Sequence, residues 1–285
     1  MTEPAFNLIL VAGAMRSGTS LLQHVLCSSP DANPFIHGSR YLTSQIGVFA
    51  QYAGKDSLYV KDYLGGREEL VAFSRDIVDR LLAETHRRLG EPKHLVLKNP
   101  ELSSYLPQAA LLMPQARFVI SLRDPKDTIA SMIGVGEKHR QSGVVSFLAR
   151  AGRDIRQLCN SYSGFYIPVL RVLQAGGGLE QRVCFSAYED LISETEKSVA
   201  RLSEFCAIPL SLEHLAPEAG WRSNFDGEAD ELSRHPHWSA YLTELSGGPI
   251  SQASIGRYRD VLSDAEAAEV DRRCGELYRS LTRRA

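Results

Sequence analysis

The sequence predicts an α/β fold of three layers, in which a central parallel sheet is flanked by helices. Two observations predict it. Apolar runs without polar alternation are typical of parallel strands, which are buried on both faces, and they occur at residues 6–12, 94–98, 117–123 and 182–187. Stretches with apolar residues at helical spacing separate these runs, and strands that alternate with helices form parallel sheets.

The first apolar run enters a glycine-spaced turn and continues into a helical pattern. Phe6–Ala12 is the predicted strand, Thr19–Ser28 is the predicted helix, and Gly13 and Gly18 lie between them. Residues without a Cβ let backbone N–H groups approach an anion, and the positive end of the helix favours negative charge. The spacing therefore predicts a P-loop-type site for a phosphate-like group, although a tight strand-to-helix turn can show the same glycines.

One position in this loop departs from the nucleotide-binding pattern G-x-x-x-x-G-K-[ST]. Thr19 holds the lysine position, whereas Ser20 keeps the hydroxyl. The lysine serves the outer phosphates of a triphosphate, so its loss argues against ordinary ATP or GTP hydrolysis. Arg16 remains as the cation of the loop.

Composition narrows the class of protein. The chain has 285 residues, of which 44% are hydrophobic and 23% are charged, and this suits one folded domain over residues 1–285. A net charge of −2 gives no long-range attraction to nucleic acid or to an anionic membrane. The five cysteines are scattered and form no C-x-x-C pair, and the sequence shows neither a leader pattern nor an apolar run of about 18 residues. We therefore expect a reduced, cytoplasmic protein without a metal site or a membrane span.

The segment after the first helix is turn-rich. Residues 31–40 predict an irregular loop at the carboxyl edge of the sheet, where α/β proteins bind ligands. His37 lies in this loop and can transfer protons near neutral pH, but an ordinary half-exposed histidine fits equally well. Residues 41–64 predict a helix or loop over the site, and residues 68–89 predict a helix that packs on the core.

Basic side chains stand at the carboxyl ends of the second and third predicted strands. Lys98 ends one strand because Pro100 cannot continue a central ladder, and Arg123 ends the next. Parallel strands end at the same edge of a sheet. These two residues and Arg16 therefore predict three cations at the functional edge.

The third strand leads into a predicted helix. Asp124 and Pro125 form a favourable N-cap and first-turn pair, and helical spacing continues through Ile133. Ser131 lies about two turns into this helix. From there its hydroxyl can reach back toward the same edge of the sheet.

The remaining chain predicts mostly helix. Residues 146–174 predict one long helix. Ser193 and Glu196 predict a capping box at the start of the next helix, and Ser263 and Glu266 predict a capping box at the start of the C-terminal helix. Residues 214–250 are rich in Gly, Pro, Ser and His and have weak periodicity. A long irregular segment of this kind is typical of a lid or binding loop, which we expect over about 214–256.

Two motifs in this chain resemble the sulfotransferase family, which uses 3′-phosphoadenosine 5′-phosphosulfate (PAPS) as sulfuryl donor. Residues 16–21 (RSGTSL) resemble the family's 5′-phosphosulfate loop, and residues 123–131 (RDPKDTIAS) resemble its 3′-phosphate motif. The resemblance runs from Phe6 to about Ser263. It implies that the cofactor is bound by Arg16, Ser17, Gly18, Thr19, Ser20, Arg123 and Ser131.

Three further positions carry the resemblance. Lys98 matches the strand-end lysine that contacts the bridging oxygen or the sulfuryl group, and Tyr188 begins a YEDL stretch similar to the adenosine-side segment. Arg257 lies in a stretch similar to the basic segment that closes over the cofactor. PAPS has two anionic ends, which need two cationic cradles. The loop with Arg16 suits one end, and Arg123 with Ser131 suits the other.

The general base stays open. In the cytosolic small-molecule branch a histidine follows two residues after the strand-end lysine, and this chain has Pro100 there. In the tyrosylprotein and related branches a glutamate after the first helix is the base, and this chain has His37 in that region. The resemblance is therefore closer to the tyrosylprotein and bacterial branch. His37 and Glu101 are the candidate bases, with Lys98 and Arg16 as the other catalytic residues.

The expected reaction is metal-free transfer of a sulfuryl group from PAPS to a hydroxyl of an acceptor. Two other classes of protein share the fold. A P-loop kinase or NTPase is disfavoured because Thr19 replaces the lysine of the loop. A non-catalytic nucleotide-binding protein is disfavoured because Lys98 is retained. Phenols, lipid or polyketide alcohols, sugars and peptide tyrosines all remain as acceptors. The sequence leaves the oligomeric state open.

Overall fold

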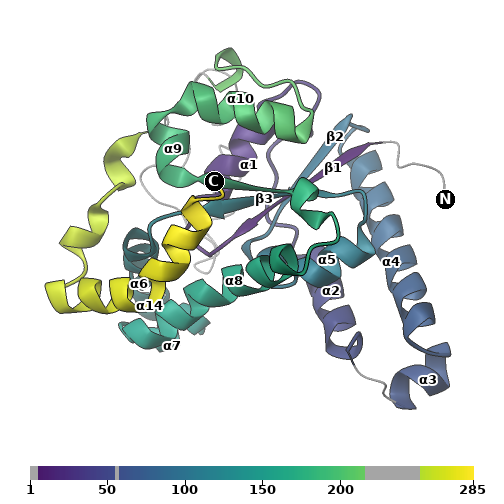
Figure 1. Ribbon diagram of the computed structural model, residues 1–285, viewed down its shortest axis with the longest axis horizontal. Helices are drawn as coiled ribbons and strands as arrows, with labels where there is room; N and C mark the ends of the chain where they lie inside the picture. Colours follow the sequence, from purple (N-terminus) through teal and green to yellow (C-terminus); the bar gives the residue numbers. More distant parts are fainter. Residues whose placement is uncertain (1–5, 55–57, 216–250) are drawn as a thin grey trace.

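A four-stranded parallel sheet forms the centre of the molecule, as the apolar runs predict (Figure 1). The computed structural model describes residues 6–54, 58–215 and 251–285. The strand order is β2-β1-β3-β4, and all neighbouring pairs are parallel. The strands are β1 (Asn7–Gly13), β2 (His94–Lys98), β3 (Arg117–Leu122) and β4 (Val183–Ala187).

Helices connect these strands and cover both faces of the sheet. The α-helices are α1 (Thr19–Cys27), α2 (Arg40–Tyr52), α3 (Leu58–Leu64), α4 (Arg67–Arg88), α5 (Leu106–Leu112), α6 (Pro125–Gln141), α7 (Phe147–Ala151), α8 (Ile155–Ala175), α9 (Tyr188–Ser193), α10 (Thr195–Cys206) and α14 (Asp264–Thr282). Short 3₁₀ turns are η1 (Pro100–Ser103), η2 (Leu179–Arg182), η3 (Glu213–Leu215), η5 (Gln252–Ser254) and η6 (Arg257–Asp260).

Alternate residues of β1 point into two separate apolar clusters. Ile9 and Val11 pack with residues of α1, α9 and α10, whereas Leu8, Leu10 and Ala12 pack with residues of α2, α4, α5, α6, α8 and α14. Figure 1 shows α1, α9 and α10 above the sheet, with α5, α6, α8 and α14 below it. Because β1 is buried on both faces, its sequence is continuously apolar.

The strand register brings the carboxyl ends of the four strands to one edge. Val11 pairs with Lys98, Gly13 pairs with Ser121, and Leu122 pairs with Ala187. The β1–α1 loop, the end of β2, the β3–α6 turn and the start of α9 therefore share that edge, which is where open α/β sheets bind ligands.

Three predictions about the helices are corrected by the structure. The stretch predicted as one helix over 146–174 is divided into α7 and α8, because Asp154 accepts a hydrogen bond from the Gln157 amide and caps a new helix. The helix predicted through Ile133 continues to Gln141.

The Ser193 capping box is also wrong, whereas the one at Ser263 is confirmed. Ser193 donates its hydroxyl to the Glu189 carbonyl in the preceding turn, and α10 begins after Glu194. At the start of α14, Ser263 accepts from the Glu266 amide and Glu266 accepts from the Ser263 amide, as the sequence predicts.

Most of the predicted lid over 214–256 lies outside the described residues, which resume at Ser251. In the part of the chain that is described, no helix is long and apolar enough to cross a membrane.

Candidate active site

The β1–α1 loop is held from inside the protein. Ser17 is fully buried, and both its amide and its hydroxyl donate to the Ala14 carbonyl, at 3.1 and 2.8 Å. The Ser121 hydroxyl donates to the Ser17 carbonyl at 2.7 Å. Ser17 therefore shapes the loop with its own polar groups.

A buried tyrosine from α8 connects the loop to β3, a role that its sequence position does not indicate. The Tyr166 hydroxyl accepts from the Ala14 amide at 3.2 Å and donates to the Ser121 carbonyl at 2.9 Å. Tyr166 is fully buried. Its position in a helical apolar stripe made it indistinguishable from a core residue.

Gly18 lets an aromatic ring lie directly against the loop. Its φ of 96° is in the left-handed region, and a Cβ there would stand 2.3 Å from Cδ2 of Tyr188. No other residue fits without displacing that ring. Thr19, which follows in the first turn of α1, is buried, and Ser20 is exposed.

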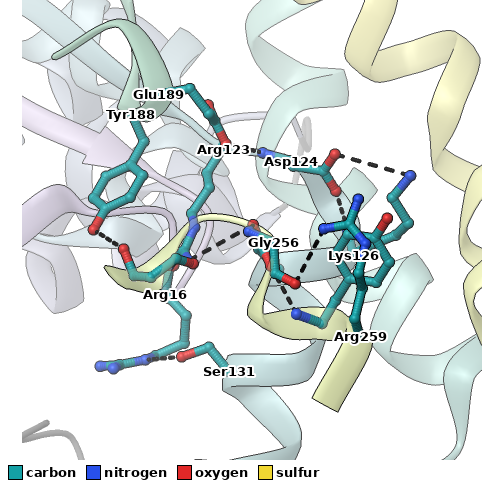
Figure 2. Close-up of polar contacts among 12 residues, drawn as sticks. Arg16, Arg123, Asp124, Lys126, Ser131, Tyr188, Glu189, Gly256 and Arg259 are labelled. Carbon is teal, nitrogen blue, oxygen red and sulfur yellow. Dashed lines mark hydrogen bonds and ion pairs between the residues drawn. The ribbon is translucent and has the colours of Figure 1, made fainter. Parts of the chain in front are cut away.

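Arg16 extends from the loop to the helix that follows β3. Its backbone has a φ of 70°, which is uncommon for a residue with a side chain. Its Nε donates to Oγ of Ser131 at 3.0 Å (Figure 2). The groups expected to serve opposite ends of PAPS are thus joined to each other in this structure.

Arg123 is a buried cation at the centre of this edge, with 8% of its surface exposed. Its Nη1 donates to the Arg16 carbonyl at 3.3 Å, and its Nη2 donates to the Ser254 carbonyl. Its guanidinium lies 4.5 Å from the centre of the Tyr188 ring. The buried Nε of Arg123 has no hydrogen-bond partner, so one of the three guanidinium nitrogens makes no hydrogen bond.

A contact between Tyr188 and Ser254 joins the end of β4 to the stretch that begins at Ser251. Their hydroxyls lie 2.5 Å apart, and Ser254 is buried. Next to Tyr188, Glu189 accepts a hydrogen bond from the Asp124 amide at 2.9 Å. Burial raises the pKa of Glu189 above its usual value. This hydrogen bond connects the start of α9 to the turn between β3 and α6.

Lys98 lies at the same edge and is a perturbed cation. Burial first, and the nearby positive charge of Arg16 second, lower its pKa to about 8. A buried lysine favours its neutral form because desolvation penalises the charge. An anion placed beside both cations would restore the protonated form.

The loop predicted at the carboxyl edge of the sheet begins instead at the amino end of β2, where Ala32 bridges to His94, and it reaches Lys98 by running along the outer edge of that strand. Asn33 uses its side chain like a strand backbone, because its Oδ1 accepts from the Val96 amide at 2.6 Å and its Nδ2 donates to the Val96 carbonyl at 3.2 Å. Further along, the Ser39 amide donates to the Lys98 carbonyl at 2.8 Å. A Cβ on Gly38 would stand 3.9 Å from Nζ of Lys98. The loop therefore brings the backbone next to His37 within reach of the lysine.

The remaining predicted site residues are exposed. His37 and Glu101 both face solvent, with His37 beside Gly38 and Glu101 in the turn η1 that Asn99 caps. Arg257 is exposed and lies between Gly256 and Tyr258 in the segment that follows Ser254.

The fold is that of open α/β proteins, whose ligand sites lie at the carboxyl ends of parallel strands. A model of the sulfotransferase family matches residues 9–212. The chain belongs to the sulfotransferase family. A Caenorhabditis briggsae protein provisionally named a protein-tyrosine sulfotransferase is 25% identical over 223 residues, which are 73% of this chain and 68% of that protein.

Solved structures share the fold at low sequence identity. The sulfotransferase domain of the curacin biosynthetic pathway has a TM-score of 0.57 at 15% identity, covering 96% of this chain and 99% of its own. The sulfotransferase domain of the Synechococcus olefin synthase has a TM-score of 0.56 at 17% identity, covering 95% of each chain. A mouse sulfotransferase solved with PAP, the desulfonated product of PAPS, has a TM-score of 0.54 at 16% identity and covers 98% of this chain and 88% of its own.

Proposed function

We propose that this chain transfers a sulfuryl group from PAPS to a hydroxyl of an acceptor. The observation that carries the proposal is the arrangement of three cations at the ends of three neighbouring strands. Arg16 follows β1, Lys98 ends β2 and Arg123 follows β3. Each comes from a motif that resembles the family, and the structure of a mouse relative contains PAP.

The residues of this edge fit a ligand with two anionic ends. Arg123 is buried and has an Nε without a partner, and a buried guanidinium with a spare donor suits a phosphate. Ser131 stands on the neighbouring helix, and its hydroxyl already accepts from Arg16. We assign the 3′-phosphate to Arg123 and Ser131, and the 5′ end to Arg16 and the loop of residues 16–20. Tyr188 lies against this loop and suits the adenosine side.

When bound, PAPS supplies an activated sulfuryl group. Lys98 stabilises the negative charge that develops on the departing side, and Arg16 supports it from the loop. His37 takes the proton of the acceptor hydroxyl, because its loop follows β2 to Lys98.

The proposed acceptor class is supported by the name of a related protein and not by the residues at the carboxyl edge of the sheet. The provisional name of the C. briggsae protein refers to protein tyrosine, and a phenolic hydroxyl has a proton that a histidine can accept. We therefore place tyrosine-like phenols first among the acceptors. Alcohols and sugars stay in the test as competing acceptors.

A binding experiment in EDTA tests the cofactor, and labelled PAPS tests the reaction. PAP at about 100 times its dissociation constant stabilises the folded state by about 2.7 kcal/mol, which raises the melting temperature. Labelled sulfate should then pass to a tyrosine peptide or a simple phenol. Stabilisation by Mg-ATP and not by PAP would instead favour a kinase.

A further inference from the structure

Asp127 is a buried carboxylate without a role in the proposed binding of PAPS or in the proposed reaction. It lies in the first turn of α6, between the two ends of the RDPKDTIAS motif, and 3% of its surface is exposed. An isolated buried carboxylate is costly, so its partners reveal its role. Those partners come from a segment about 130 positions further along the chain.

Both oxygens of Asp127 bind backbone amides of that segment. Oδ2 accepts from the Gly256 amide at 2.8 Å, and Oδ1 accepts from the Tyr258 amide at 2.9 Å. These amides flank Arg257. The carboxylate therefore fixes the backbone on both sides of the cation that resembles the family's closing segment.

The same carboxylate also faces the phosphate cradle. Its Oδ2 lies 4.0 Å from Nη2 of Arg123, and this Nη2 donates to the Ser254 carbonyl two residues before Gly256. Asp127 thus contacts both the cation of the cradle and the chain that returns from the undescribed segment. Two amides and one guanidinium compensate its charge.

Gly256 makes this approach possible. Its φ of 77° is in the left-handed region, which residues with a Cβ rarely adopt. The turn that presents the Gly256 and Tyr258 amides to one carboxylate therefore favours glycine.

We infer that Asp127 is a positioning residue that latches residues 254–258 onto the 3′-phosphate cradle. It sets Arg257 and the guanidinium of Arg123 in their binding positions, so that recognition of a 3′-phosphate depends on the latch. This inference rests on the proposed function for its ligand, whereas the latch itself is a property of the ligand-free protein.

Hydrogen exchange in the ligand-free protein tests the latch. In Asp127→Asn the carboxylate charge is lost and one oxygen becomes an NH₂ donor, so exchange of the Gly256 and Tyr258 amides should accelerate about ten- to hundred-fold. Asp31→Asn is the matched control, because it removes one carboxylate charge at the opposite end of the sheet, where Asp31 pairs with Lys93. Unchanged exchange at both amides in Asp127→Asn overturns the latch.

Competition between PAP and adenosine 5′-phosphate tests the effect on recognition. The wild type should prefer PAP, and Asp127→Asn should reduce this preference at least about ten-fold, with little change in the affinity for adenosine 5′-phosphate. Gly256→Ala disrupts the same turn with Asp127 intact and should give the same result. Asp31→Asn should keep the preference.

The outcomes separate the latch from the proposed function. Faster exchange with an unchanged preference for PAP overturns the positioning role. If the wild type does not bind PAP, the proposed function is refuted, and so is the inferred effect of Asp127 on recognition of the 3′-phosphate. The hydrogen-exchange result still tests whether Asp127 holds residues 254–258 in the ligand-free protein. An equal loss of affinity for both nucleotides means general damage to the site and also overturns the positioning role.

Discussion

Nε of Arg16 donates to Oγ of Ser131 at 3.0 Å, across 115 positions of the sequence. The bond joins the β1–α1 loop to α6, and the Arg16 carbonyl accepts from Arg123 at 3.3 Å nearby. The two cradles inferred from separate motifs are therefore one connected group of side chains. Substitutions at Arg16 and Ser131 should consequently be non-additive in ligand binding.

Replacing Arg123 should weaken binding of PAP specifically through its 3′-phosphate. Charged hydrogen bonds contribute about 1.5–3 kcal/mol, so Arg123→Ala should lower the affinity roughly ten- to hundred-fold. Titration calorimetry measures this loss. Arg123→Lys keeps the charge but not the fork of donors and should recover only part of it. If removal of the 3′-phosphate from the ligand costs as much in Arg123→Ala as in the wild type, the assignment is wrong.

The kcat/KM of the reaction should decrease at alkaline pH. Lys98 has a pKa of about 8 in the free protein, and only its protonated form stabilises negative charge. The kcat/KM of the wild type should therefore fall as pH rises through about 8, because this constant reports groups of the free enzyme. Arg16→Gln removes a nearby positive charge and should move this limb to higher pH.

A lysine-to-arginine change provides the control for that profile. The guanidinium of Lys98→Arg stays charged at all accessible pH values, so any remaining activity should lack the alkaline limb. A limb of the same position in Lys98→Arg would assign the titration to another group.

The lowered pKa of Lys98 also makes stability depend on pH. The ordinary pKa near 10.5 applies to the unfolded chain, so between about 8 and 10.5 the unfolded state binds more protons than the folded state. The contribution of Lys98 to the free energy of unfolding therefore rises with pH across this window. Denaturant titrations at several pH values should show this rise in the wild type, and Lys98→Met should lack that contribution.

His37→Ala should lower kcat with little effect on binding. A general base contributes typically 10²–10⁴-fold, so single-turnover rates should fall at least about a hundred-fold, while calorimetry should show normal binding of PAP. Glu101→Ala is the paired variant and should keep its rate. The opposite pattern, with the rate lost in Glu101→Ala and kept in His37→Ala, would exchange the two roles.

Tyr166→Phe should destabilise the protein and loosen the β1–α1 loop. The hydroxyl is fully buried between the Ala14 amide and the Ser121 carbonyl, and its removal leaves the amide without that acceptor. A cost of about 1–3 kcal/mol in the free energy of unfolding is expected, together with weaker binding of PAP. Tyr41→Phe, at a side chain that is 66% exposed, should stay within about 0.5 kcal/mol of the wild type. Equal free energies of unfolding for Tyr166→Phe and Tyr41→Phe would contradict the role of Tyr166 in holding the β1–α1 loop.

Local patterns in the sequence were enough to predict the strands and one edge of the sheet. Strands buried on both faces are continuously apolar, so β1, β2, β3 and β4 were visible as apolar runs. Lys98 and Arg123 were placed at one edge because parallel strands end together. The sulfotransferase family was visible in the same way, because its loop and its RDPKDTIAS stretch are contiguous.

Contacts between residues far apart in the sequence became visible in the folded chain alone. Asp127, Tyr166 and Ser254 carry no local signal, because an aspartate in a first turn, a tyrosine in an apolar stripe and a serine in a turn are all common. Their roles arise from partners at sequence separations of 129 for Asp127 and Gly256, 152 for Tyr166 and Ala14, and 131 for Ser254 and Arg123. Such contacts depend on strand order and helix packing, which a local pattern does not contain.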